Sequence, residues 1–382
     1  MRVGILTGSF LPAIGGMEYV IHYLSEALVK NGIDVVVFCH VSGGKPDRRF
    51  PYEVVQYGRN IPFSGRLGIN RRSGISHIKE FHGKKKISLI HCHNVSYPGE
   101  IAVDVQKETG IPLVMTPHGQ DVQIFPKINY GIRLKKGWER KIRTHLSAAD
   151  AVTAISESIE KDIDFVEDYK RYRIPNGVQY SKFRCRPSSY LHSFLDIPLD
   201  SKIIISVGRN HIKKGYEAGI RAFAESGIHT DDNVKYAIIG KDVQQLSGVV
   251  NELKMESKIF LVPPLPPEDI IQCYHSSYLF FSPSITEGLS MVSIEAMAAG
   301  LPILATDVPG NRDIVKENNC GRLVPCEDIS AMGKMLKEFI ENPEMRNQLA
   351  GQSDKNADRY DWANIAKMYC RVYEKVLHKK GA

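Results

Sequence analysis

The sequence alternates along its whole length between short apolar runs and longer amphipathic segments, and this alternation constrains the fold most strongly. The short runs, rich in Val, Ile and Leu, predict buried strands, and the segments between them predict helices. In the segment 17–31, for example, Val20, Leu24 and Leu28 fall on one face of the expected helix. Strands that are joined through helices form parallel sheets, so we expect an α/β protein.

The expected strands form two groups, one in each half of the chain. They cover residues 2–6, 35–38, 88–91, 112–115 and 151–154, then 203–207, 236–239, 259–262, 278–281 and 302–305. A Pro-Asn-Gly turn at 175–177 separates the groups. We therefore expect two doubly wound, Rossmann-like domains, residues 1–178 and 179–360, which face each other across a cleft. Such sheets bind ligands at the carboxyl ends of their strands.

The composition excludes several classes of protein. Hydrophobic residues make up 43% and charged residues 24%, a globular balance that argues against a disordered or coiled-coil chain. No apolar run approaches the ~18 residues that a membrane span needs, and the N-terminal segment does not resemble a signal peptide. The 7 Cys include no C-x-x-C pair, so we expect reduced thiols and a cytoplasmic location.

The net charge of +7 lies entirely in the first half. Residues 1–180 carry 25 Lys and Arg against 18 Asp and Glu, while residues 181–382 carry 25 of each. The densest basic segment runs from Lys127 to His145 and contains Trp138. Such a segment, with the Lys run at 84–86, suits an anionic membrane surface and a peripheral enzyme, but a solvated helix with Trp138 in the core explains it equally well.

The strongest local signal is the segment that follows the strand at 278–281. Glu287 lies just before an expected helix, and Glu295 lies about two turns inside it, ~10 Å further along the axis. The paired carboxylates of a retaining glycosidase lie only ~5 Å apart, so these two have another role. Glu295 is suited to accept the two hydroxyls of a ribose. Free backbone N–H groups that form an anion site are expected at Gly288, Leu289 and Ser290.

Two further loops follow predicted strands. After the strand at 203–207, Arg209 and Lys214 leave the strand end together and are expected to reach one diphosphate. After the first strand, the adjacent glycines Gly15 and Gly16 allow a ligand to approach the backbone at a helix N-terminus. Adjacent glycines do not make the G-x-G-x-x-G fingerprint of nicotinamide cofactors.

Histidines follow the strands at 88–91 and 112–115. His118 is expected to hydrogen-bond a substrate, and Asp121 to orient the His118 ring by accepting a ring N–H. His91 and His93 resemble a metal-binding pair, but the sequence offers no third ligand nearby. We therefore expect no metal site, and His91 and His93 should line the cleft or pack locally.

Taken in order, the motifs resemble those of the retaining glycosyltransferases of family 4, which have the GT-B fold. They are P-x-x-G-G-x-E at 12–18, H-x-x-D at 118–121, P-N-G-V at 175–178, G-R-x4-K-G at 208–215, E-x7-E at 287–295 and D-V-x-G at 307–310. Six motifs in this order over nearly the whole chain are specific for the family. Gln179 and Ser290 depart from its usual Asp and Gly, and nothing in the motifs specifies the sugar.

The resemblance implies retaining transfer of a hexose from a UDP- or GDP-sugar to an acceptor hydroxyl, without a cofactor or metal, in polysaccharide or glycolipid biosynthesis. It implies that the second domain binds the nucleotide-sugar and the first domain a sugar or lipid-linked acceptor. Residues 361–382 resemble the last helix of the family, which crosses back onto the first domain. The implied contacts are Glu287 and His118 with the donor sugar, Glu295 with the ribose, Arg209, Lys214 and Gly16 with the diphosphate, and Asn176 in a supporting position.

Two alternatives stay open. One is a non-catalytic GT-B subunit that binds a sugar nucleotide as a partner protein, and the other is a sugar-nucleotide epimerase. The presence of Arg209, Lys214, Glu287 and Glu295 favours a transferase. Nucleic-acid binding is suggested by the charge alone, so no nucleic-acid partner is expected.

Overall fold

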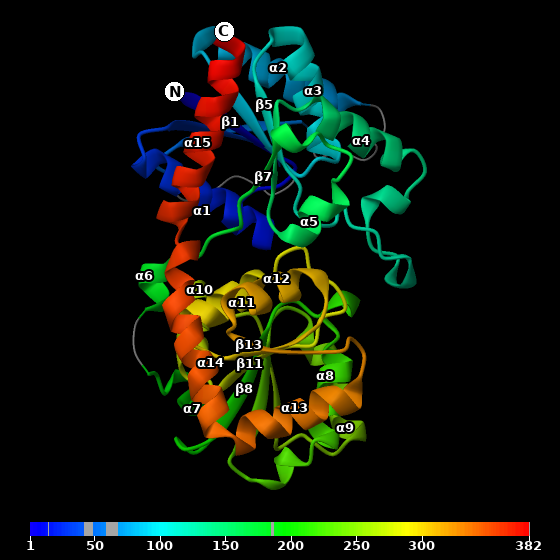
Figure 1. Cartoon of the computed structure of the whole chain (residues 1–382), viewed down its shortest axis with the longest axis vertical. Coiled ribbons are helices and arrows are strands. Elements are labelled where there is room, and N and C mark those ends of the chain that lie inside the picture. Colours follow the sequence, from blue (N-terminus) through cyan, green and yellow to red (C-terminus); the bar gives the residue numbers. More distant parts are fainter. Residues whose placement is uncertain (14, 42–48, 59–67, 185–186, 382) are drawn as a thin grey trace. The chain divides into compact units, whose positions relative to one another are not determined.

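The computed structural model describes residues 1–13, 15–41, 49–58, 68–184 and 187–381 (Figure 1). It divides into two compact units. Unit 1 contains Met1–Gly177 and Trp362–Ala382, and unit 2 contains Val178–Asp361. The two boundaries lie one residue from those drawn from the sequence.

Unit 1 is built on a parallel sheet with the strand order β3-β2-β1-β4-β5-β6-β7 in its described part. The strands are β1 (Arg2–Thr7), β2 (Asp34–His40), β3 (Glu53–Tyr57), β4 (Leu89–His93), β5 (Leu113–Thr116), β6 (Ala151–Ala154) and β7 (Arg171–Arg173). The central strands β4, β5 and β6 are buried throughout, as expected of strands covered on both faces.

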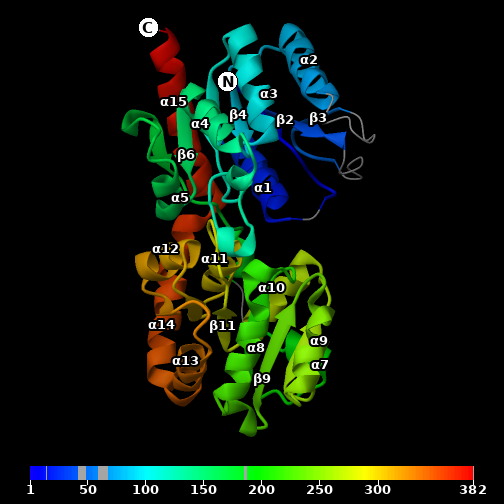
Figure 2. The same ribbon diagram turned by 90° about the vertical axis from the view of Figure 1, so that its right-hand side faces the viewer.

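Helices cover both faces of this sheet. They are α1 (Gly16–Lys30), α2 (Ile69–Lys84), α3 (Tyr97–Thr109), α4 (Trp138–Ala148), α5 (Glu157–Asp162) and α15 (Trp362–Gly381), with short 3-10 turns η2 (Pro126–Ile128), η3 (Ile132–Leu134) and η4 (Asp168–Lys170). Right-handed crossovers place α1 on one face and α2 to α5 on the other. The helix α15 follows unit 2 in the chain, yet it packs against α1 and belongs to unit 1 (Figures 1 and 2, red).

Unit 2 is built on a second parallel sheet, with the order β10-β9-β8-β11-β12-β13 in its described part. The strands are β8 (Lys202–Val207), β9 (Val234–Ile239), β10 (Ile259–Val262), β11 (Leu279–Ser282), β12 (Ile303–Thr306) and β13 (Gly321–Val324). In β8 the side chains of Ile203, Ile204 and Ile205 are fully buried, which explains the continuous apolar run in the sequence.

The helices of unit 2 also form two layers. They are α6 (Tyr180–Phe183), α7 (Tyr190–Leu195), α8 (Tyr216–Glu225), α9 (Ser247–Glu252), α10 (Pro267–His275), α11 (Met291–Ala298), α12 (Pro309–Asn318), α13 (Ile329–Glu341) and α14 (Pro343–Asn356), with 3-10 turns η5 (Ile212–Lys214), η6 (Ile228–Thr230), η7 (Val243–Leu246) and η8 (Ala357–Tyr360). Contacts of α8 with α9 and α13, and of α11 with α12 and α14, define the layers. No described helix is both long and apolar enough to cross a membrane.

Each sheet reverses its strand order at one point. In unit 1 the chain runs outward from β1 through β2 to β3 and then returns to place β4 on the other side of β1. In unit 2 the same reversal occurs between β8 and β11. Ligands of doubly wound sheets bind beyond the carboxyl ends of the strands at such a reversal. The loops after β1, β4, β8 and β11 are therefore the places where the fold itself favours a site.

Candidate functional site

The loops after β8 and β11 meet at the strand reversal of unit 2. Residues 208–215 follow β8 and residues 283–290 follow β11, and we call them the switch-point loops. A backbone hydrogen bond joins them, in which the Ile285 N–H donates to the Lys213 carbonyl at 2.7 Å. The fold thus brings together the G-R-x4-K-G and E-x7-E motifs, which are far apart in the sequence.

A buried ion pair connects the two switch-point loops. The Lys214 Nζ lies 2.6 Å from the Glu287 Oε1, and the two side chains are only 15% and 6% exposed. The Ser284 hydroxyl donates to the same carboxylate oxygen at 3.0 Å, and the Lys213 Nζ lies 3.6 Å from the Oε2. Burial alone would raise the pKa of Glu287, but the two ammonium groups outweigh burial and hold it below its ordinary value. Glu287 is therefore a carboxylate at neutral pH.

Backbone N–H groups are available where α11 begins. Ser290 occupies the N-cap position without a side-chain cap, and α11 starts at Met291. In the described part of the chain, the N–H groups of residues 289–292 donate to no protein acceptor. The sequence predicted this site at Gly288, Leu289 and Ser290, and Leu289 and Ser290 are among the unpaired residues. Unpaired N–H groups at a helix N-terminus, next to the Lys214 ammonium, suit a phosphate group.

Glu295 lies one to two turns into α11, where it meets a tyrosine of α10. The Tyr274 hydroxyl donates to the Glu295 Oε2 at 3.0 Å. Burial raises the pKa of Glu295 to about 7, although the hydrogen bond from Tyr274 and the charge of Lys214 both act to lower it. The side chain keeps a partly exposed surface. Glu295 is therefore partly protonated at neutral pH, a property that the sequence did not predict.

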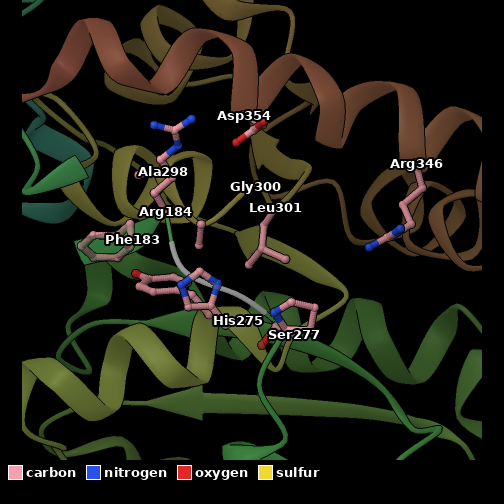
Figure 3. A pocket seen from close by; sticks show the side chains of 12 residues that line it. Phe183, Arg184, His275, Ser277, Ala298, Gly300, Leu301, Arg346 and Asp354 are labelled. Carbon is pink, nitrogen blue, oxygen red and sulfur yellow. The ribbon is translucent and has the colours of Figure 1, made fainter. Parts of the chain in front are cut away.

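Tyr274 also lines a pocket of about 350 Å³ in unit 2 (Figure 3). In Figure 3 the side chains of Arg184 and Asp354 lie close to one another at one end, and Arg346 approaches from the other end. Apolar walls come from Phe183 and Leu301. Tyr274 thus lies between this pocket and Glu295.

Two glycines hold the switch-point loops in place. The Gly310 N–H donates to the Glu287 carbonyl at 3.1 Å, and a Cβ at Gly310 would lie 2.8 Å from that oxygen. Gly215 has φ +61°, and a Cβ there would lie 2.1 Å from the Pro283 carbonyl oxygen. Both contacts need a backbone without a side chain, which explains the glycines of the D-V-x-G and G-R-x4-K-G motifs.

Arg209 stands apart from the buried pair. It follows β8 by two residues, is exposed, and forms no ion pair with any residue that the structure describes. Lys214, in contrast, is packed close to the backbone of Gly208: a Cβ placed on Gly208 would lie 3.3 Å from the Lys214 Cε. The sequence predicted that Arg209 and Lys214 reach one diphosphate. The structure fixes Lys214 in the pair with Glu287 and leaves the Arg209 side chain exposed.

In unit 1, the loop after β1 ends at the N-terminus of α1. The helix begins at Gly16, with Gly15 at the N-cap and no side-chain cap. A Cβ at Gly16 would meet no atom within 4 Å, so the backbone there is open. Glu18 in the first turn accepts a hydrogen bond from the Ser9 hydroxyl and so pins the loop to the helix.

Three histidines cluster at the carboxyl ends of β4 and β5: His91 and His93 are in β4, and His118 follows β5. The His93 Nδ1 lies 2.9 Å from the His118 Nε2, and the His91 and His93 rings have centroids 4.1 Å apart. His91 is held at both nitrogens, by the Tyr373 hydroxyl at 2.7 Å and the Thr116 hydroxyl at 2.6 Å. Burial lowers the pKa of His91 to about 3 and that of His118 to about 4. The cluster is therefore uncharged at neutral pH.

Asp121 was expected to accept a ring N–H of His118, but in the structure it accepts backbone N–H groups instead. The Asp121 Oδ1 accepts the backbone N–H groups of His118 and Gly119 at 2.9 and 3.0 Å, and its Oδ2 accepts the Val95 N–H at 3.0 Å. It accepts no N–H from the His118 ring, which pairs with His93 instead. A carboxylate three residues after the histidine is placed to cap the turn of its own loop, because the backbone N–H groups there lack other acceptors.

The basic segment from Lys127 to His145 is partly neutralised. Arg133 and Arg143 both pair with Glu139, and Lys141 pairs with Glu100 at 2.6 Å. Trp138 is 7% exposed and packs edge-on against Tyr97, so it belongs to the core.

Exposed side chains occur along the whole segment and include Lys127, Lys141 and Arg143. Leu134, Lys135, Lys136 and Arg140 are also exposed, and the three cations among them form no ion pair within the described part of the chain. Trp138 therefore lies in the core, as the second interpretation drawn from the sequence expected, while basic side chains of the segment stay exposed on the surface.

Asn176 is buried near the end of the first segment of unit 1. In the described part of the chain it makes no hydrogen bond to the switch-point loops or to the histidines at the ends of β4 and β5. A Cβ at the neighbouring Gly177 would meet the Trp362 ring at 2.6 Å. Among the described residues, no group of three His, Cys, Asp or Glu side chains is arranged to hold a metal ion.

Sequence reasoning missed Tyr274, Ser284 and the pairing of His93 with His118. Ser284 lies within three residues of Glu287, so its capping contact had a local signal. Tyr274 lies on a different helix from Glu295, and no sequence spacing predicts their contact.

Comparison with known proteins agrees with the motifs. Residues 14–182 match the family model described as Glycosyltransferase Family 4, and residues 191–356 match the model described as Glycosyl transferases group 1. The D-inositol 3-phosphate glycosyltransferase of Corynebacterium urealyticum is 25% identical, over 94% of this chain and 90% of its own length. The alpha-monoglucosyldiacylglycerol synthase of Streptococcus pneumoniae is 24% identical, over 90% of this chain and 80% of its own.

The fold has solved counterparts. The structure of sucrose-phosphate synthase from Thermosynechococcus elongatus superposes with a TM-score of 0.85 at 21% identity, over 99% of both chains. The two parallel Rossmann-like sheets and this likeness confirm the GT-B class that the sequence predicted. With the two family models covering most of its length, the chain belongs to the group 1 glycosyltransferases of family 4.

Proposed function

We propose that this glycosyltransferase moves a hexose from a nucleotide diphosphate sugar to an acceptor hydroxyl with retention of configuration, and that unit 2 holds the donor. One observation carries the proposal. The buried pair of Lys214 and Glu287 lies beside unpaired N–H groups at the start of α11, at the strand reversal where such sheets bind ligands. A cation and free N–H groups suit the diphosphate, and the carboxylates suit sugar hydroxyls.

The mechanism follows from where charge develops. As the bond between the sugar and the nucleotide breaks, negative charge grows on the diphosphate and positive charge on the sugar carbon. Lys214, Arg209 and the N–H groups of residues 289–292 oppose the first of these charges, and they interact more strongly as the charge grows. Retention follows if the acceptor attacks from the face that the diphosphate leaves, with the departing phosphate taking the acceptor's proton. We propose that this step needs no metal or cofactor.

The acceptor class is drawn from the relatives. One is named for inositol 3-phosphate and another for a glucosylated diacylglycerol. We propose that unit 1 binds a phosphorylated polyol or a lipid-linked acceptor at the cytoplasmic membrane face. The exposed cluster of Leu134, Lys135, Lys136 and Arg140 is the surface that suits anionic lipid, at ~1 kcal/mol per cation.

The donor assignment is tested by thermal unfolding with UDP, GDP and ADP and by sugar transfer with the Arg209→Ala variant. A nucleotide at ~100 times its dissociation constant stabilises by ~2.7 kcal/mol, which raises Tm by several degrees. Loss of one charge-assisted contact, worth roughly 1.5–3 kcal/mol, should slow transfer on the order of 10–100-fold. Because Arg209 is exposed and unpaired among the described residues, Tm without nucleotide should not change.

Lys334→Ala, which removes an exposed cation on α13, is the control and should keep full transfer. Full transfer by Arg209→Ala, or no stabilisation by any nucleotide, would contradict the donor site. Stabilisation without transfer to any acceptor would favour the partner subunit or the epimerase. Acceptors presented in anionic vesicles and in solution separate the lipid-linked from the soluble class.

Nucleotide affinity should depend on pH through Glu295. Because an ionised carboxylate accepts both ribose hydroxyls, affinity should rise as pH increases through the pKa of about 7. Glu295→Gln should bind more weakly, with little change between pH 6 and 8, as measured by titration calorimetry. Glu338→Gln, an exposed change on α13, should behave as the parent protein.

Although Glu295→Gln should weaken nucleotide binding, it should raise the free energy of unfolding at pH 8. The folded state keeps the Glu295 proton up to about pH 7, whereas the unfolded chain loses it near 4.5, so the parent's free energy of unfolding falls across this interval. The variant lacks this fall and should gain Tm relative to the parent at pH 8. A parent affinity that does not vary with pH would contradict the ribose contact.

A further inference from the structure

His93 is a buried histidine with one satisfied nitrogen. It ends β4, is 0% exposed, and its Nδ1 lies 2.9 Å from the His118 Nε2. Its Nε2 has no hydrogen-bond partner among the residues that the structure describes. The His91 ring packs against His93, and His91 is itself fixed at both nitrogens by Tyr373 and Thr116. His93 therefore has little freedom to turn its unpaired nitrogen elsewhere.

The hydrogen bond between the His93 Nδ1 and the His118 Nε2 contains a single hydrogen, which either ring can supply. Burial lowers the pKa of both His93 and His118, so each ring is neutral and carries a single N–H. In one arrangement the His93 Nδ1–H donates to the His118 Nε2, and the remaining hydrogen of His118 is on its Nδ1. In the other, the His118 Nε2–H donates to His93, and the hydrogen of His93 is left on its buried, unpaired Nε2.

The two arrangements differ in what they leave unpaired. The first leaves a bare ring nitrogen of His93 in the core, and the second leaves a buried N–H donor. Orphaned buried N–H groups are the rarer of the two in native structures. The first arrangement is therefore favoured, with His118 protonated at Nδ1, although neutral histidine in water prefers Nε2–H.

The backbone of His118 is fixed independently. The Asp121 Oδ1 accepts the His118 N–H at 2.9 Å. With the backbone held by Asp121 and the Nε2 occupied by His93, only the Nδ1 of His118 is left for a ligand. The structure gives this atom no protein partner in the part of the chain that it describes.

We propose that His93 is a positioning residue that holds His118 as an N–H donor, through Nδ1, to a sugar oxygen of the substrate. Hydroxyl and ring oxygens of a sugar accept such a hydrogen bond, whereas the bare nitrogen of the other tautomer would accept one. The inference rests on the proposed function, because it is the transferred sugar or the acceptor sugar that His118 contacts. His93 itself touches no substrate and acts through His118.

The tautomer is tested by nitrogen NMR of the full chain labelled with ¹⁵N-histidine at neutral pH. The resonances of His118 are assigned by their loss in His118→Ala. We expect His118 to be protonated at Nδ1 in the parent protein and in His93→Asn, whose amide N–H replaces the Nδ1–H of His93. In His93→Phe, which removes the donor, His118 should revert to the Nε2–H form. An Nε2-protonated His118 in the parent protein would overturn the inference.

Transfer kinetics give a second readout. Loss of one neutral hydrogen bond, by misorienting its donor, should lower kcat/KM about 10-fold in His93→Phe. His93→Asn should restore most of the rate. His192→Phe is the matched control, because His192 is also buried but lies in α7 of unit 2, where its Nε2 bonds the Ser201 carbonyl. It should leave the His118 resonances unchanged.

The two proposals fail in different ways. Full transfer by His118→Ala would overturn the substrate contact, and with it the function proposed for His118, whatever the tautomer. Equal rates in His93→Phe and His93→Asn, with the tautomer changed only in the first, would overturn the positioning role while leaving the donor site in unit 2 intact.

Discussion

Replacing Lys214 with methionine is expected to lower sugar transfer on the order of 100–1000-fold, measured as kcat/KM. Lys214 is a fixed cation of the switch-point loops, so its loss would remove the charge-assisted contact proposed with the diphosphate, where preorganised charge contributes most. It also leaves Glu287 buried without its closest partner. Removing one member of a buried pair typically costs about 3–5 kcal/mol of stability, so Tm should fall as well.

A double variant separates these two effects. In Lys214→Met with Glu287→Gln neither charge remains, so most of the lost Tm should return while transfer stays low. Lys213→Met is the control for charge alone, because the Lys213 Nζ lies 3.6 Å from Glu287 and should matter less. A parent-like rate in Lys214→Met, or a double variant no more stable than Lys214→Met, would contradict the account of the pair.

The second large effect is expected from Gly215→Ala. The alanine needs φ +61°, a left-handed conformation that costs about 1–2 kcal/mol, and its Cβ would lie 2.1 Å from the Pro283 carbonyl oxygen. The backbone segments around residues 215 and 283 must separate to admit the methyl group, which costs about 1–3 kcal/mol of further stability. The displaced segment leads into Ser284 and Glu287, so transfer should fall at least 10-fold, together with Tm.

Gly351→Ala is the matched control for this variant. Gly351 lies in α14, and a Cβ there would meet no atom within 4 Å. Alanine is the better helix former by about 1 kcal/mol, so Tm should rise slightly and transfer should not change. If Gly215→Ala kept both the Tm and the transfer of the parent protein, the close approach of residues 215 and 283 would not be required.

The sequence predicted the inner strands of both sheets and the edge strand β10, but it missed the other three edge strands. All ten expected strands are present, whereas β3, β7 and β13 were missed. Each of the three lies at the edge of its sheet, where a strand is less buried and its sequence is shorter or more polar, as in the Arg-Tyr-Arg of β7. Continuous apolar runs detect strands that are buried on both faces. The edge strand β10 was detected because its run Ile-Phe-Leu-Val is apolar throughout, whereas a polar edge strand such as β7 gives no such signal.

The site was predictable in its loops and not in its side-chain partners. The motifs indicated that Lys214 and Glu287 lie near one another, because both follow strands at the carboxyl edge of the sheet, where such sheets bind ligands. Their direct ion pair, the Tyr274 contact to Glu295 and the His93 contact to His118 depend on which strands are neighbours and which way each side chain turns. Neither property is encoded in local spacing. For this reason the sequence predicted that Asp121 accepts the ring N–H of His118 rather than its backbone N–H.

The path of α15 has a consequence for how the protein is made. On the ribosome, residues 1–177 emerge first, but the helix that covers α1 and supplies the Tyr373 hydroxyl to His91 is translated only after all of residues 178–361. The histidine cluster therefore lacks one of its anchors throughout synthesis of the second half. A nascent chain cannot complete unit 1 until α15 is made, so a premature stop before codon 362 would leave unit 2 whole and unit 1 without its last helix.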